Sequence, residues 1–225
     1  MRGEEHMPTI FIIGDSTVED NTPPFRGWGW ALKNYVAAGC TVKNYACSGC
    51  SSRSFFEKGL LDPVEKEIRA GDLLLIQFGH NDEKDDERHT DPENTFPAFL
   101  RHYCRTAAEK EATPVLITPV CRRYFVGDGG LLYTHGEYPL AVRNVAREDG
   151  IALCDLNRDS RKLYLTLGEE KTAELFVRLQ PGEHPDYPDG HDDRTHFCAV
   201  GAERIARLLA EELSALPVCR KFISL

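Results

Sequence analysis

IFIIGDSTVED, residues 10–20, begins as a buried strand and ends in a polar turn. The apolar run TIFII (9–13) has strand length and is closed by a glycine and an acid. A serine follows where the strand reaches the surface, and two interpretations of it are open. Ser16 with Glu19 three residues later is typical of a capped helix N-terminus, but a serine at a strand end is also well placed to be a nucleophile.

Further apolar runs of strand length follow along the chain. Each is bounded by glycine, proline or aspartate signals, and they are TVKNYA (41–46), DLLLIQF (72–78), PVLITP (114–119) and IALCDL (151–156). Together with the first run they predict five buried strands.

Between the strands the apolar residues recur with a helical period. Asp91 followed by Pro92 predicts a helix that starts with a cap and an N1 proline. Its apolar stripe consists of Phe96, Phe99, Leu100, Tyr103 and Ala107. The last helix of the chain has the stripe Ala202, Ile205, Leu208, Leu209 and Leu213.

The alternation of strands and helices predicts an α/β fold with a five-stranded parallel sheet covered on both faces, a three-layer α/β/α sandwich. There is no internal repeat and no low-complexity linker, so we predict a single domain over residues 1–225. The charged stretch 83–89 is predicted to be a solvated loop.

The composition narrows the possible partners. The chain has 27 basic and 36 acidic residues, and a surface of that sign repels phosphate backbones, so we expect no nucleic acid partner. No apolar run approaches the roughly 20 residues of a membrane span, and the acids in MRGEEHMPTIFII (1–13) do not suit a signal peptide. We therefore predict a cytoplasmic protein without membrane contact, whose eight cysteines are reduced and mostly buried.

The predicted architecture indicates where a ligand would bind. In a doubly wound sheet of the flavodoxin-like order 2-1-3-4-5, the crevice lies beyond the carboxyl ends of strands 1 and 3. The loops after those strands carry Ser16 and GHND (79–82). The side-chain amide of Asn81 could donate to a developing oxyanion, and Gly49, after strand 2, could present an unshielded N–H as a second donor.

A serine nucleophile also needs a base and a group that orients the base. The stretch GHDDRTHFCAVGA (190–202) precedes the last helix and contains Asp193 and His196, three residues apart. A single turn could hold the carboxylate against one imidazole nitrogen while the other nitrogen faces outward.

These motifs resemble blocks I, II, III and V of the SGNH (GDSL-type) hydrolases, in the same order across nearly the whole chain. Further stretches are similar to the rhamnogalacturonan acetylesterase branch, and they are GWGWAL (27–32), SSRSF (51–55), TPVCRRYF (118–125) and THFCAVGA (195–202). The resemblance implies the SGNH hydrolase fold and a carbohydrate O-acetylesterase. We predict that its substrate is a small acetylated saccharide of the pectic type and that it uses no cofactor or metal.

The resemblance also implies a role for each motif residue. Ser16 would be the nucleophile, His196 the base and Asp193 the residue that orients the base. The oxyanion would be held by the backbone N–H groups of Ser16 and Gly49 and by the side chain of Asn81.

The candidates for substrate contact are Asp15, Trp28, His80, Arg122 and Arg123. Trp28 could offer a flat face to a sugar or belong to the core. Arg122 and Arg123 could pair with a uronate carboxylate or be solvated surface arginines. The negative charge and the cytoplasmic location favour short oligosaccharides over long pectin chains.

Other functions remain open at this point. The same site could serve longer acyl esters, thioesters or lysophospholipids. Cys47 and Cys50 form a CxxC that could be a redox pair, half a zinc site or a regulatory disulfide. The His and Asp residues between 184 and 196 are of ligand type but lack a recognisable metal spacing. We make no prediction of the oligomeric state.

Overall fold

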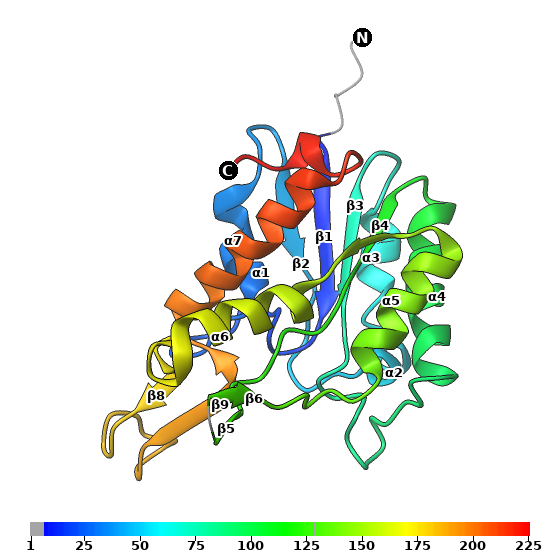
Figure 1. The fold of residues 1–225 in the computed structure, drawn as a ribbon. Helices are drawn as coiled ribbons and strands as arrows, with labels where there is room; N and C mark the ends of the chain where they lie inside the picture. Colours follow the sequence, from blue (N-terminus) through cyan, green and yellow to red (C-terminus); the bar gives the residue numbers. More distant parts are fainter. Residues whose placement is uncertain (1–6, 128) are drawn as a thin grey trace.

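A parallel sheet forms the centre of the computed structural model, which describes residues 7–127 and 129–225. The strands lie in the order β2-β1-β3-β4-β7, so the order reverses between the first and third strands as predicted (Figure 1). They are β1 (Thr9–Gly14), β2 (Thr41–Asn44), β3 (Leu73–Gln77), β4 (Thr113–Ile117) and β7 (Ala152–Cys154). Each coincides with one of the five predicted runs to within a few residues, which confirms the fold class.

Helices cover both faces of the sheet (Figure 1). One face packs against α1 (Trp28–Leu32), α6 (Leu156–Ala173) and α7 (Ala199–Ala215). The other packs against α2 (Ser52–Glu57), α3 (Asp62–Glu67), α4 (Thr95–Glu109) and α5 (Tyr138–Asp149). Short 3₁₀ helices, η1 (Lys33–Tyr35) and η2 (Arg220–Phe222), flank these layers. The result is the predicted three-layer sandwich, with one apolar cluster on each side of the sheet.

The predicted helix at residue 91 begins a few residues later than expected. The Asp91 carboxylate accepts hydrogen bonds from the N–H groups of Glu93 and Asn94, so it closes a separate turn ahead of α4. The predicted stripe is otherwise correct, because Phe96, Leu100, Tyr103 and Ala107 are buried.

Two antiparallel hairpins extend from the carboxyl end of the sheet and were not predicted (Figure 1). One is formed by β5 (Phe125–Val126) and β6 (Gly130–Leu131), the other by β8 (Phe176–Leu179) and β9 (His191–Phe197). In the second hairpin, Phe176 pairs with Phe197 but Arg178 pairs with Asp192. Strand β9 therefore contains extra residues that bulge out of the ladder.

All eight cysteines are free, and five of them are buried, as predicted. None of the described helices combines the length and the apolar character that a membrane span needs.

Candidate active site

Ser16 lies in a tight turn at the carboxyl end of β1. The Asp15 carboxylate accepts hydrogen bonds from both the N–H and the Oγ1 of Thr17, at 2.9 and 2.8 Å. Asp15, rather than Ser16, therefore caps this turn, and no helix begins here. The Ser16 hydroxyl is left to face the cavity beyond the sheet.

A continuous contact runs from the serine to a carboxylate. Oγ of Ser16 lies 2.9 Å from Nε2 of His196, although 180 residues separate them. Nδ1 of His196 lies 2.9 Å from Oδ2 of Asp193. Burial opposes the charge of Asp193, but hydrogen bonds from the His196 ring and from the backbone outweigh it and hold the pKa of this carboxyl well below its usual value.

The bulge in β9 explains how residues three apart meet. Oδ1 of Asp193 accepts hydrogen bonds from the N–H groups of Thr195 and His196, at 2.6 and 2.8 Å. The carboxylate thus closes a turn inside an irregular strand. The motif was predicted to occupy a turn before the last helix, and the structure adds that this turn belongs to β9.

The predicted oxyanion donors line the same cavity as Ser16 and His196. Gly49 has φ +75°, a left-handed conformation that favours glycine. The Asn81 amide donates one N–H to the carbonyl oxygen of Cys50 at 2.9 Å. Within the described part of the chain, the backbone N–H groups of Ser16 and Gly49 have no protein acceptor.

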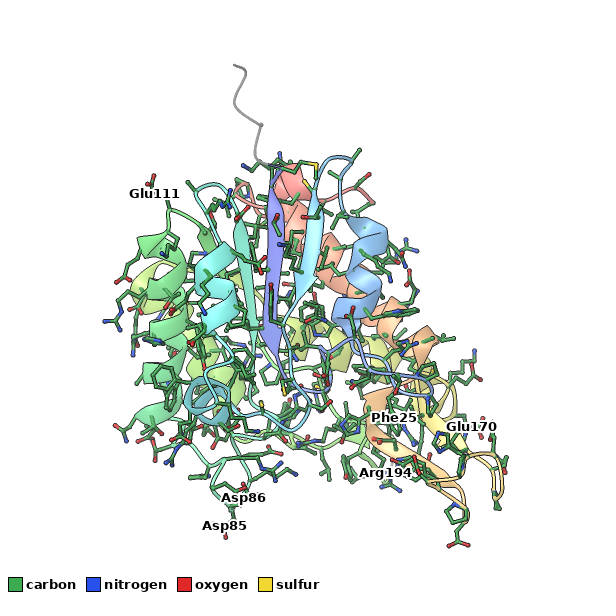
Figure 2. The ribbon with its side chains drawn as sticks, turned by 180° about the vertical axis from the view of Figure 1, so that it is seen from behind. Phe25, Asp85, Asp86, Glu111, Glu170 and Arg194 are labelled. Carbon is green, nitrogen blue, oxygen red and sulfur yellow. The ribbon has the colours of Figure 1, made fainter. Side chains whose placement is uncertain are left out.

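Two cavities meet at the serine. The first, of about 520 Å³, and the second, of about 350 Å³, share Ser16, Asn81 and His196 in their walls. Figure 2 shows that the loop bearing Asp85 and Asp86 extends at the same end of the molecule as the segment with Phe25. The loops predicted to form a crevice therefore enclose one.

Sequence reasoning missed several residues of the first cavity. Phe25 and Tyr187 form an aromatic wall, with ring centroids 5.9 Å apart. Phe25 also meets the His196 ring edge to face at 5.9 Å. Arg88 and His191 complete this wall. Both aromatic residues stand in polar loops outside any motif, and Arg88 belongs to the stretch predicted to be a solvated loop.

Three of the predicted substrate contacts are buried and line neither cavity. Trp28 has no exposed surface and donates its indole N–H to Oε1 of Gln77 at 2.9 Å. Arg123 donates to the carboxylate of Asp192 and thereby braces β9. Asp15 is fully buried beneath the serine turn. This corrects the prediction that these side chains contact substrate.

The other two candidates, His80 and Arg122, line the second cavity, although both are buried. Arg122 is already paired with Glu83 at 2.5 Å, so its charge is largely neutralised. Lys84 reaches the same cavity from the loop after β3, and its side chain makes no hydrogen bond or ion pair among the described residues.

His80 and Asp15 form a buried pair below the site. Nδ1 of His80 lies 3.3 Å from Oδ2 of Asp15. Burial lowers the pKa of His80 to about 4, and the negative charge of Asp15 opposes that shift only in part. His80 is therefore neutral near pH 7.

Cys47 of the CxxC has little thiol reactivity in this environment. Burial and a hydrogen bond with Cys50 raise the pKa of Cys47 to about 11, so the thiol is protonated at neutral pH. In the described ranges, no three His, Cys, Asp or Glu side chains converge as a metal site requires.

The sandwich and the serine, imidazole and carboxylate contacts define the class of protein. The chain belongs to the GDSL-like lipase/acylhydrolase family, which it matches over residues 12–204. It is 44% identical over 210 residues to the rhamnogalacturonan acetylesterase RhgT of Bacillus subtilis (strain 168), covering 92% of this chain and 90% of that one.

Solved structures show the same fold. The Bacillus subtilis protein YxiM superposes with a TM-score of 0.81 at 29% identity, over 93% of this chain and 57% of YxiM. This chain thus spans little more than half of that protein. A catalytic mutant of the acetylxylan esterase Axe2 from Geobacillus stearothermophilus shares the fold with a TM-score of 0.61 at 17% identity, over 91% of this chain and 93% of Axe2.

Proposed function

We propose that the chain is a serine esterase that removes O-acetyl groups from carbohydrates through an acetyl-enzyme intermediate. The observation that carries the proposal is the contact series from Ser16 through His196 to Asp193, with both hydrogen bonds at 2.9 Å. This geometry matches what a hydroxyl nucleophile requires: a base within reach and a carboxylate that orients the base.

In the first step, Oγ of Ser16 attacks the carbonyl carbon of the acetyl group. Nε2 of His196 takes the hydroxyl proton, because Nδ1–H is held by the ionised Asp193. The carbonyl π electrons move to the oxygen, which becomes an oxyanion.

The oxyanion would be stabilised by three donors that are in place before the reaction. We assign them to the free N–H groups of Ser16 and Gly49 and to the second amide hydrogen of Asn81. Gly49 lines the first cavity, and its positive φ favours a residue that has no side chain to shield this N–H.

Collapse of the intermediate breaks the ester bond. His196 returns its proton to the departing sugar oxygen, which leaves as an alcohol. Water then attacks the acetyl-enzyme with His196 as base. This step releases acetate and regenerates the hydroxyl of Ser16.

We further propose that the substrate is an acetylated pectic saccharide of the rhamnogalacturonan type. Phe25 and Tyr187 offer apolar ring surface beside the serine. Lys84 places positive charge at the second cavity of a chain whose net charge is −9, which favours an acidic sugar over a neutral one. The relative RhgT is named a rhamnogalacturonan acetylesterase, which supports the same substrate class.

The cytoplasmic location stays a prediction. Free thiols are compatible with a cytoplasmic location. That location would favour short oligosaccharides that have entered the cell.

Acetate release from acetylated pectic oligomers and from acetylated xylo-oligomers tests the proposal. We expect a higher kcat/KM on the pectic oligomers, and the Ser16→Ala variant to be nearly inactive on both. Release from neither substrate would refute the carbohydrate assignment. A rate on aryl esters that rises from acetyl to octanoyl would instead favour a longer-chain acyl esterase.

A further inference from the structure

The carboxylate that orients the base is contacted by a second imidazole. Nε2 of His191 lies 3.0 Å from Oδ2 of Asp193, the same oxygen that lies 2.9 Å from Nδ1 of His196. The other oxygen, Oδ1, is occupied by two backbone N–H groups. Asp193 therefore accepts four hydrogen bonds, and His191 contributes one that the proposed reaction does not require.

The fold explains why this imidazole reaches the carboxylate. His191 and Asp193 are two residues apart on β9, so the strand places both side chains on one face. The His191 ring packs against Tyr187 at 4.5 Å between centroids and against Phe25 at 6.1 Å. These contacts hold the ring in position, and it remains 29% exposed at the cavity wall.

The contact also fixes how His191 carries its proton. An ionised carboxylate only accepts hydrogen bonds, so Nε2 of His191 must be the protonated nitrogen. Negative charge on Oδ2 is then divided between two N–H donors. Less of it is available to stabilise His196 when the base becomes positively charged.

We propose that His191 is a positioning residue that acts through Asp193. Its N–H holds the carboxylate in the orientation that His196 needs and limits how strongly the carboxylate favours the protonated base. The inference deepens the proposed function and rests on it, because the reaction must use His196 as its base.

Variants at position 191 separate the hydrogen bond that His191 donates to Asp193 from the packing of its ring against Tyr187. His191→Phe keeps an aromatic ring against Tyr187 but cannot donate a hydrogen bond. His191→Gln keeps an N–H donor but loses the ring. His184→Phe is a matched control, because His184 stands on the same hairpin segment and also packs against Tyr187 but does not contact Asp193.

The measurement is the pH dependence of kcat/KM for acetate release, together with thermal stability. For His191→Phe we expect a roughly tenfold loss of kcat with little change in KM, since a hydrogen bond to a charged group is removed. The acidic limb should move to higher pH by roughly 0.5 to 1 unit, because the carboxylate then favours the protonated base more strongly. His191→Gln should recover most of the rate, and His184→Phe should keep the original profile.

The other titratable or charged groups that line the two cavities around His196 are unchanged in all variants, and they are Asp193, Tyr187, His80, Lys84, Arg88, Arg122 and Tyr124. A shift of the acidic limb of the pH profile can therefore be attributed to the substitution at position 191. A purely structural loss would lower the rate equally at every pH. Wild-type kinetics in His191→Phe, an impaired variant whose limb does not move upward, or a larger loss in His191→Gln would each overturn the inference.

A second measurement uses the unmodified protein and does not depend on the variants folding. Nitrogen-15 NMR of the imidazoles should find His191 protonated at Nε2 at neutral pH, and protonation at Nδ1 alone would overturn the inference. If the wild-type enzyme released no acetate, the proposed function would fail while this measurement stayed readable. An active wild type with an unaffected His191→Phe variant would refute only the role of His191.

Discussion

The side chain of Asn81 is tied to the carbonyl oxygen of Cys50 by a hydrogen bond of 2.9 Å. This bond joins the loop after β3 to the turn after β2, which carries Gly49. The same asparagine is contacted on its other side by Arg88, whose Nη1 lies 3.3 Å from Oδ1. Two of the proposed oxyanion donors are therefore held relative to each other before any substrate binds.

Asn81→Ala should lower kcat by about a hundred- to a thousandfold while the protein stays folded. Loss of one preorganised oxyanion donor typically has this effect. The measurement is kcat for acetate release, with circular dichroism to confirm folding. Asn94→Ala removes an exposed asparagine at the start of α4 and should leave kcat unchanged. A folded Asn81→Ala enzyme with nearly full turnover would exclude Asn81 from the oxyanion site.

Trp28→Phe should lower stability without weakening substrate binding. The indole N–H donates to the buried side chain of Gln77, and an unsatisfied buried acceptor costs about 1–3 kcal/mol. We expect urea denaturation to show that loss and KM for the saccharide to stay constant. Trp30→Phe, at a half-buried position, should be less destabilising. Raised KM with unchanged stability would instead restore Trp28 as a sugar contact.

Lys84→Gln should reduce the preference for acidic substrates. Lys84 is exposed at the second cavity, and an exposed ion pair contributes up to about 1 kcal/mol, so kcat/KM for uronate-containing oligomers should fall roughly two- to fivefold. The difference should shrink at high salt, and kcat/KM for neutral acetylated oligomers should not change.

Lys110→Gln provides the control for net charge. Lys110 follows α4 and precedes β4, so it lies at the amino end of the sheet, away from the cavities. The Lys110→Gln substitution should leave kcat/KM for both the uronate-containing and the neutral oligomers unchanged. Equal losses in the two lysine variants would mean that only the overall charge matters.

His80 should make the protein less stable on acidification. The pKa of His80 is lowered to about 4 by burial, below the value of about 6.5 in an unfolded chain. Between these two values the unfolded state binds more protons, so the free energy of unfolding falls as pH drops through the window from about 6.5 to 4.

The comparison with His80→Gln isolates this effect, because glutamine does not titrate. Between pH 7.5 and pH 5 the wild type should lose roughly 2 kcal/mol more unfolding free energy than the variant. Urea denaturation at the two pH values measures the difference. Parallel losses in the two proteins would show that His80 does not resist protonation.

The central sheet could be predicted because its strands lie in short apolar runs; β1 and β3 are buried throughout, whereas the edge strand β2 is only partly buried. Most of the runs end at or beside a glycine, proline or aspartate, and the register puts Gly14 opposite Gln77, so the loops after β1 and β3 meet. The serine, the asparagine and the Asp193–His196 pair could be proposed as site residues for a similar reason, since each stands in a recognisable motif at a strand end or before the last helix.

The hairpin of β8 and β9 could not be predicted in the same way. The residues of β9, HDDRTHF, are nearly all polar, and only its last residue is buried. No apolar alternation marks such a strand. His191 was consequently seen only as one member of a polar cluster, and its contact with Asp193 depends on a strand that no sequence pattern indicates.

Burial explains why three of the predicted substrate contacts were wrong. Trp28, Arg123 and Asp15 carry groups that suit sugar binding, but each finds a partner inside the protein. Arg88, in contrast, lies in a charged stretch that resembles any solvated loop, and only the folded loop brings it to Asn81.

Labelling with a fluorophosphonate, mapped by mass spectrometry, tests the central claim most directly, because such a reagent modifies a serine only where a base activates it. We expect one modified peptide, with the adduct on Ser16, and no adduct in the Ser16→Ala or His196→Ala variants. An adduct on another residue, or acetate release by a protein that takes up no label, would contradict the account.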